Sequence, residues 1–139
     1  LYEDNPFNFP DIVVSSMVTP PVATGASASV TSGMLGDQIR FDMSGTDDQG
    51  VSNIHLFLTK PDGSTLRVEC GAGDDTVASC GANYTLGQSQ FSQAGTYTYK
   101  GMNIRDKYGV DAGGSTAWPP QVLYEDNPFN FPDIVMQGN

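Results

Sequence analysis

Hydrophobic and polar residues alternate along several short stretches of the chain, which is the pattern of half-buried β-strands. The clearest are QIRFDM at 38–43 and VSNIHLFLT at 51–59. One face of each is apolar and is expected to point into the core: Ile39, Phe41 and Met43 in the first strand, and Ile54, Leu56 and Leu58 in the second. No stretch has the period of a helix longer than one turn. About seven short strands separated by turns predict an all-β fold, an antiparallel β-sandwich.

Other segments fill in the expected order of strands and breaks. Proline pairs, Gly-rich runs and the KPDG sequence indicate where strands end. The expected elements are a short strand before Pro20, a loop with a short edge segment at 25–36, a turn at 44–50, a tight turn at 60–63, strands at 64–70 and 83–86, a polar connection at 87–94, a strand at 95–106 with a bulge near Gly101, and a last strand at 115–124.

The segment LYEDNPFNFPDIV occurs twice without a single change, at 1–13 and at 123–135, an offset of 122 residues. Self-similarity of this kind is typical of tandem arrays. We therefore expect a first joint at 1–9, one sandwich module at 10–122, and a second joint with the start of a next module at 123–139. A duplicated tag is the alternative, and the prolines, phenylalanines and acids of the segment argue against it.

Charge narrows the range of partners. The 139 residues include 16 acidic and 6 basic side chains, a net charge of −10. This balance disfavours nucleic acid and anionic membrane surfaces and suits a protein that meets divalent cations. Solubility alone explains the charge equally well. No run of about 20 apolar residues is present, so no membrane insertion is expected.

Cys70 and Cys80 flank a Gly- and Asp-rich stretch, GAGDDTVAS. Two cysteines at this spacing, next to strand-like residues, predict a local disulfide and an oxidising, extracellular compartment. Such a bond would stabilise the fold by about 2–3 kcal/mol in the chain-entropy account. A pair of free thiols is the alternative.

Several motifs together resemble the bacterial immunoglobulin-like repeats of long surface adhesins and of some secreted enzymes. They are a Pro-led first strand, a Thr-x-Asp-x-x-Gly-Val bend, a strand ending in Pro-x-Gly, and a Gly-Thr-Tyr-Thr strand followed by Asp-x-x-Gly. Here they read T46-D-D-Q-G-V51, P61-D-G63, G95-T-Y-T98 and D106-K-Y-G109. The resemblance covers about residues 10–122 and implies an immunoglobulin-like sandwich of about seven strands. It implies nothing about a ligand.

The chain shows no catalytic constellation, and we expect it not to be an enzyme. His55 is the sole histidine and any triad would have to use it. A histidine on a strand is more often a surface or edge residue. Exposed aromatics such as Tyr97, Tyr99 or Trp118 would suit a glycan-binding or accessory module of a secreted hydrolase, which is the alternative function.

Acidic residues suggest a calcium site. In an immunoglobulin-like sandwich the chain enters at the end that carries two loops rich in Asp, so joint and loops would share one pole. Carboxylate oxygens from separate segments are the ligands calcium takes. The candidate ligands are Glu3, Asp4 and Asp11 from the joint, Asp47 and Asp48 from one loop, and Asp106 and Asp111 from another. Simple solvation of these acids is the alternative.

The joints suggest the function. Phe7 and Phe9, with their copies Phe129 and Phe131, alternate along an extended segment and can dock against a neighbouring domain. Packing within their own module is the alternative. We expect a structural repeat of an extracellular bacterial adhesin or surface filament, a spacer or fibre-building unit. Its partners would be neighbouring copies of the same module, with lateral self-association as a further option.

Overall fold

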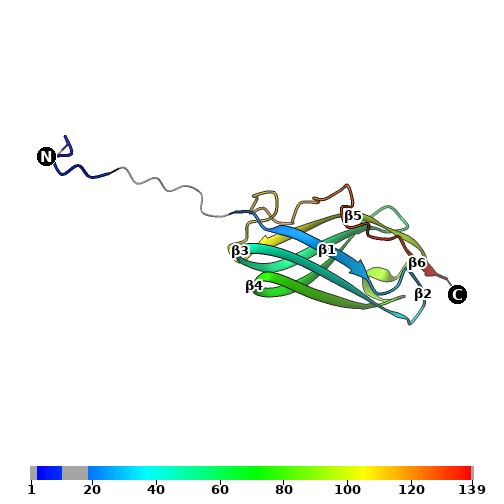
Figure 1. Ribbon diagram of the computed structural model, residues 1–139. Coiled ribbons are helices and arrows are strands. Elements are labelled where there is room, and N and C mark those ends of the chain that lie inside the picture. The colour runs from blue at the N-terminus through cyan, green and yellow to red at the C-terminus, as the bar shows by residue number, and fades with distance from the viewer. Residues whose placement is uncertain (1–2, 11–18, 139) are drawn as a thin grey trace.

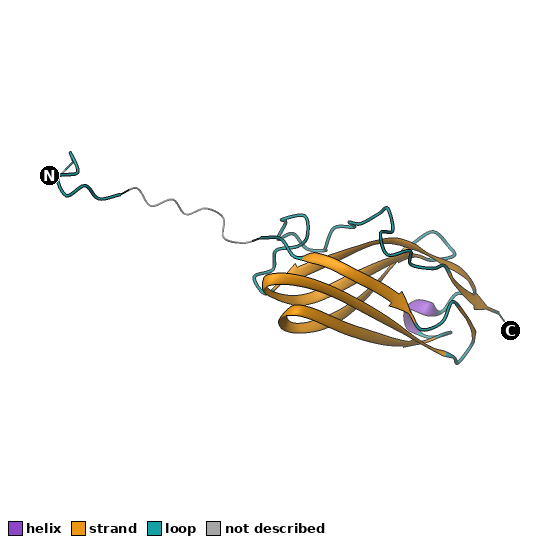
Figure 2. Cartoon of the chain, viewed as in Figure 1, coloured by secondary structure: helices purple, strands orange, loops and turns teal. Residues whose placement is uncertain are grey.

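Two long strands, β3 (Gln38–Thr59) and β4 (Thr65–Thr85), run through both layers of the fold (Figure 1). The computed structural model describes residues 3–10 and 19–138. Within these residues the elements are β1 (Val22–Ala28), β2 (Ser32–Met34), β3 (Gln38–Thr59), β4 (Thr65–Thr85), the 3-10 turn η1 (Ser89–Phe91), β5 (Gly95–Asp106) and β6 (Ile134–Gln137). The fold is all-β, as the alternating pattern predicted (Figure 2).

Strand pairing is antiparallel except at one edge. The order β1-β3-β5-β6-β2 forms one curled sheet, and β4 pairs with β3 along its whole length. The first half of β3 pairs with β1 over 41–46, and the second half pairs with β5 over 51–59. β6 lies between β5 and β2, antiparallel to the first and parallel to the second.

A bend at one end turns the β3–β4 hairpin back on itself. The register between the strands shifts between Thr46 and Val51, so extra residues of β3 bulge at this point. Gly50 sits at the bend with φ 115°, and a Cβ there would lie 2.4 Å from the carbonyl oxygen of Asp74, so only glycine fits. The two halves of each strand consequently lie one over the other as two layers of a sandwich (Figure 1).

The core lies between these layers and matches the alternation in the sequence. Every core residue expected in the two clearest strands is 0–1% exposed. The tight turn at 60–63 is present, closed by a bond from the Gly63 amide to the Lys60 carbonyl (2.9 Å). The bulge expected near Gly101 is also confirmed, because the register with β3 shifts between Tyr99 and Gly101.

Several expected breaks are instead continuous strand. The turn at 44–50 is the bulged bend of β3, and the cysteine stretch at 71–79 belongs to β4. Backbone pairing such as Ser44 with Ser79 and Gly45 with Ala78 needs no apolar side chain, so polarity misled the prediction. Residues 25–28, expected as part of a loop, belong to β1, which begins at Val22. Residues 115–124 form no strand beyond a single bridge between Leu123 and Met102. The strand expected before Pro20 lies outside the described residues.

The fold does not end at residue 122. Residues 123–137, expected as a joint and the start of a next module, pack onto the same sheet and supply β6. Phe131, Ile134 and Met136 are 0–4% exposed and belong to the one hydrophobic core. The first described residue of the sandwich and its last strand lie at opposite ends of the molecule (Figure 1).

Candidate functional site

The second copy of the repeated segment is fastened to the sandwich at its start. Leu123 and Met102 exchange two backbone hydrogen bonds, of 2.7 and 2.9 Å. The Tyr124 hydroxyl accepts a bond from the Ala23 amide (3.0 Å), and the Tyr124 carbonyl accepts one from the Tyr99 hydroxyl (2.6 Å). These bonds link the segment to both β1 and β5.

A loop held by asparagine follows. Asn127 donates from Nδ2 to the Phe131 carbonyl (2.9 Å) and accepts at Oδ1 from the Phe131 amide (2.7 Å). Asn127 and Asn130 adopt left-handed backbone angles, φ 53° and 52°, which asparagine tolerates better than most residues. This loop delivers the Phe131 ring to the core, 6.2 Å from the ring of Phe41 and 6.0 Å from that of Tyr99.

The first copy has the same loop in different surroundings. Asn5 brackets Phe9 with bonds of 2.8 and 2.7 Å, and Asn5 and Asn8 have φ 53° and 52°. Residues 3–10 lie apart from the sandwich (Figure 1). Phe9 is 67% exposed, against 4% for its copy Phe131. Phe7 is 78% exposed, whereas its copy Phe129 packs partly against the core near Tyr124. Phe129 and Phe131, expected to dock a neighbour, therefore pack within their own module.

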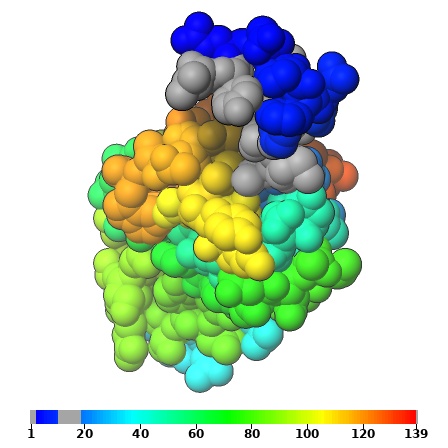
Figure 3. Space-filling model, turned by 90° about the vertical axis from the view of Figure 1, so that its left-hand side faces the viewer, coloured from blue at the N-terminus to red at the C-terminus, as the bar shows by residue number. Residues whose placement is uncertain are grey.

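Figure 3 looks onto the end of the molecule at which the chain enters the sandwich. Two of the expected calcium ligands, Asp47 and Asp106, lie at the bend of β3. Asp106 is the last residue of β5 and pairs with Val51 beside the bend. Asp47 and Asp106 are 7% and 1% exposed. Each has one oxygen that accepts backbone bonds, whereas Asp47 Oδ1 and Asp106 Oδ2 are buried without a hydrogen-bond partner. Burial raises the pKa of Asp47, and the negative charges of Asp106 and Asp48 add to the rise.

The remaining candidate ligands are not assembled there. Asp111 is bound to the Gly113 and Ser115 amides and to the Asn103 side chain. Glu3 and Asp4 are exposed in the first copy, and Asp48 is exposed at the bend. Asp11 lies outside the described residues. Across residues 3–10 and 19–138, no group of three or more acidic, histidine or cysteine side chains is placed to hold a metal.

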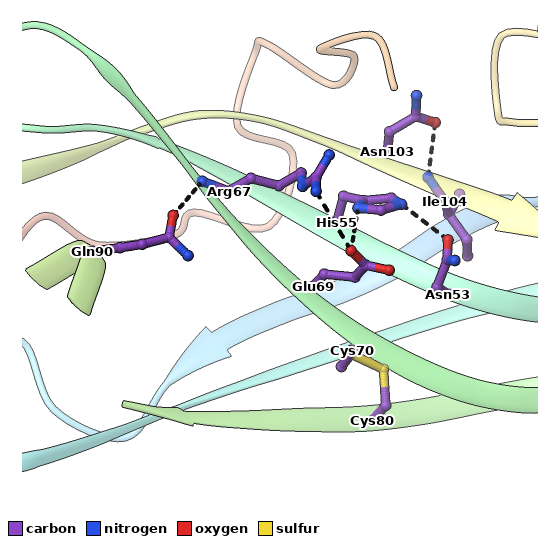
Figure 4. Close-up of polar contacts among 9 residues, drawn as sticks. All are labelled: Asn53, His55, Arg67, Glu69, Cys70, Cys80, Gln90, Asn103 and Ile104. Atoms are coloured by element: carbon purple, nitrogen blue, oxygen red, sulfur yellow. Dashed lines mark hydrogen bonds and ion pairs between the residues drawn. A yellow bond between two sulfur atoms is a disulfide. The ribbon is translucent and has the colours of Figure 1, made fainter. Parts of the chain in front are cut away.

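His55 is buried rather than a surface or edge residue, contrary to expectation. It lies on the outer face of β3, where its Nε2 is 2.9 Å from Asn53 Oδ1 and its Nδ1 is 3.9 Å from Glu69 Oε2 (Figure 4). The Trp118 ring packs edge-on over it at 5.9 Å. Burial, together with the charges of Arg67 and Arg105, lowers the pKa of His55 to about 4.

Residues 107–122, which include Trp118, cover His55, and a residue that the sequence analysis did not single out holds them in place. Asn103 of β5 pairs with His55 of β3 and is fully buried. Its Nδ2 donates to Asp111 Oδ2 (3.1 Å) and to the Gln121 carbonyl (2.8 Å), and its Oδ1 accepts from the Ala112 amide (3.3 Å). One side chain thus holds residues 107–122 against the sheet. Its position in an alternating strand gave no signal for this role.

Cys70 and Cys80 form the expected disulfide, with Cα atoms 5.8 Å apart (Figure 4). Cys70 pairs with Ile54 and Cys80 with Met43, so the bond joins the two arms of β4 across the bend. It therefore links the two layers, and its presence is typical of an oxidising compartment. No helix in the described part of the chain is long and apolar enough to cross a membrane.

The aromatics considered for glycan binding do not share one surface. Tyr97 is fully buried and donates its hydroxyl to the Gln93 carbonyl (2.6 Å), and Tyr99 is engaged with the second copy. Trp118 is 55% exposed, with the guanidinium groups of Arg67 and Arg105 at 4.8 and 5.2 Å from its ring. A flat platform of several rings is therefore not formed by these three side chains.

The chain matches no protein-family model, and no curated protein resembles it in sequence. Among solved structures it is similar to the CARDB domain of the PF1109 protein from Pyrococcus furiosus, determined in complex with di-metal ions. The identity is 13%, the match covers 91% of this chain and 99% of that one, and the TM-score is 0.35. At these values the likeness carries no argument about ligand or function. The chain itself folds as an all-β sandwich.

Proposed function

We propose that this chain is a structural repeat module of an extracellular bacterial adhesin or surface filament, and that it acts as a spacer or fibre-building unit. One observation carries the proposal: the 13-residue segment at 1–13 recurs unchanged at 123–135, where it completes the sandwich. In a tandem string, each copy would close the module before it and lead directly into the next.

The arrangement of the ends supports this role. The chain enters the sandwich at one end, and β6 leaves at the other (Figure 1). Modules joined in this way extend end to end rather than side by side. A disulfide across the bend and a His55 buried beneath Trp118 agree with a durable, non-catalytic unit in an oxidising setting.

A tandem chain tests the proposal. Residues 1–135 followed by residues 14–139 give two modules that share one middle copy of the segment. Small-angle scattering should give a maximum dimension close to twice that of the single module. A matched tandem chain with a Gly-Ser insertion after the middle copy should show a broader distribution. A compact pair of modules, or no difference between the two chains, would contradict the spacer role.

We propose, in addition, that a calcium ion binds at the bend. The specific observation is the pair of buried oxygens without partners, Asp47 Oδ1 and Asp106 Oδ2. A buried carboxylate oxygen without a hydrogen-bond partner is costly, and a cation would offset that cost. Two carboxylates fill part of the six to eight oxygen ligands typical of calcium. Backbone carbonyls and water would supply the rest.

The raised pKa of Asp47 predicts how the stability of the cation-free protein changes with pH. Because this pKa is raised in the folded state, the folded chain holds the proton more tightly, and stability without cation falls as pH rises above the ordinary value near 3.8. Asp47→Asn should therefore stabilise the chelated protein at pH 7. Calcium should raise the melting temperature of the unmodified chain but not of Asp47→Asn. Equal melting temperatures with calcium and with chelator would eliminate the site.

A further inference from the structure

The described part of the first copy, residues 3–10, has the same local conformation as the second copy but is not buried. In both copies an asparagine side chain makes two hydrogen bonds to the backbone of the phenylalanine four residues later, an arrangement called here the asparagine bracket. The bond lengths of the two brackets agree within 0.1 Å and the φ angles within 1°. The conformation is therefore set within the segment and does not need the sandwich. Yet Phe9 is 67% exposed whereas Phe131 is 4% exposed. A preorganised segment with an exposed apolar ring binds at a lower entropic cost than a flexible one.

The surface that receives such a segment is known from the second copy. It consists of the Ala23 amide, the Tyr99 hydroxyl, the ring of Phe41, the edge of β5 at 95–97, and β2 with the Thr31 carbonyl. Each of these interactions uses either the backbone of the segment or a side chain that the first copy also has.

Beyond the identical residues, the two copies still share the pattern of apolar and polar positions. With the offset of 122, Val14 takes the place of Met136 and Ser15 that of Gln137. Met136 is buried and Gln137 exposed in β6. The first copy thus retains an apolar residue at the inward position and a polar one at the outward position, so it can form the whole of β6.

We propose that residues 1–15 are a donor strand, which closes the sandwich of a second copy of this chain in the place that residues 123–137 occupy here. This rests on the proposed function in that the acceptor is another module of the same kind. Insertion into its own sandwich is disfavoured. Val13 would have to lie at the β6 end, whereas β1 begins at Val22 at the opposite end, and residues 14–21 would have to return over the molecule (Figure 1).

Exchange of an identical element between protomers has a low free-energy cost, because the donated strand makes the same interactions as the strand that it replaces. In the unmodified chain the second copy competes from within the same molecule and keeps the acceptor surface filled. Substitutions that weaken the packing of the second copy alone should therefore let the first copy bind the acceptor surface of another molecule.

The test uses the full chain with Phe131→Ser and Ile134→Ser. Size-exclusion chromatography with light scattering should show at least a doubling of mass that grows with concentration, because each first copy closes the next molecule. The matched control carries Phe9→Ser and Ile12→Ser, the equivalent positions of the first copy, and should remain a monomer. All four substitutions together should abolish association. A monomer in the first variant, or association that persists with all four substitutions, would overturn the proposal.

A peptide measurement covers the case in which the weakened chain does not fold alone. A synthetic peptide with the sequence of residues 1–15, added during refolding of the four-substitution chain, should restore a cooperative melt. The same peptide with Phe9→Ser should not. No restoration by either peptide, or equal restoration by both, would also overturn the proposal. The tandem-chain experiment is independent, so an extended two-module string without donor-strand exchange would leave the proposed function standing.

Discussion

Residues 3–10 and 125–132 have one sequence and one local structure but two environments. In both, an asparagine at the start of the loop brackets the backbone of a phenylalanine four residues later. In the second copy that phenylalanine enters the core, and in the first it is mostly exposed. The comparison separates the effect of the local sequence on conformation from the effect of the surrounding strands on burial. The sequence of the segment determines its loop, whereas pairing with β5 and β2 determines its burial and its share in stability.

The largest expected difference comes from the same substitution in each copy. Phe131→Ala should lower the free energy of unfolding by about 3–5 kcal/mol, because it leaves a cavity among Phe41, Tyr99 and their neighbours. Phe9→Ala should change it by no more than about 0.5 kcal/mol, as exposed substitutions usually do. Urea unfolding of the two variants measures both. Equal losses would show that the copies are not structurally distinct.

Acid should destabilise the sandwich but leave the difference between Phe131→Ala and Phe9→Ala unchanged. His55 has a pKa of about 4 in the folded state, below its ordinary value of 6.5, so the unfolded chain binds the proton more readily between these values. Stability is therefore fully present above pH 6.5 and is lost as pH falls toward 4, by an amount on the order of 3 kcal/mol.

Replacement His55→Gln should flatten this part of the pH profile. The loss caused by Phe131→Ala should be similar at pH 7 and pH 5, because His55 lies on the outer face of β3 and shares no ring contact with Phe131. Unfolding curves across the pH range test both statements. A profile that is unchanged in His55→Gln would assign the acid sensitivity to other groups.

The disulfide joins two parts of β4 and lies outside both copies of the segment. Cys70→Ala with Cys80→Ala should lower the free energy of unfolding by about 2–3 kcal/mol, since the bond closes a loop of 10 residues across the bend. Alkylation before reduction should add no mass to the unmodified chain. Incorporation of two alkyl groups without reductant would contradict the bond.

The smallest expected difference concerns the asparagine bracket. Asn127→Ala should cost about 1–2 kcal/mol, because it removes two hydrogen bonds to Phe131 and places alanine in a left-handed conformation. Asn5→Ala should leave global unfolding unchanged, since the first copy lies outside the sandwich. Asn127→Gly serves as a control that keeps the backbone angle accessible and should lose less than Asn127→Ala. A loss of the same size for Asn5→Ala would place the first copy within the fold.

Much of the body could be predicted from the sequence. Alternation identified the core faces of β3, and the turn residues of KPDG and the glycine at 101 identified the turn and the bulge, because each is set by local sequence. Tertiary context was harder to anticipate. His55 is buried because residues 107–122 cover it through Asn103, which its own strand does not reveal. β1 was missed because VATGASA has small residues at an edge, where little apolar surface is needed.

The two copies mark the limit of sequence reasoning most clearly. Identical residues cannot tell which copy is buried, because the difference lies in strands far away in the chain. Of the acids predicted to bind calcium, Asp47 and Asp106 are buried next to the bend, whereas Asp111 holds residues 107–122 over His55. The asparagine bracket could have been anticipated, since asparagine favours loops with left-handed residues.

Amide hydrogen exchange at Phe9 and Phe131, followed by NMR in the unmodified chain, tests the central claim most directly. Both amides donate a bond of 2.7 Å to an asparagine side chain, so their local protection is matched. At a concentration where the chain is monomeric, Phe131 should exchange only through global unfolding, on the order of 1,000-fold or more slower than Phe9. Rates within about tenfold of each other would contradict the account, because the second copy would then not be an integral strand of the sandwich.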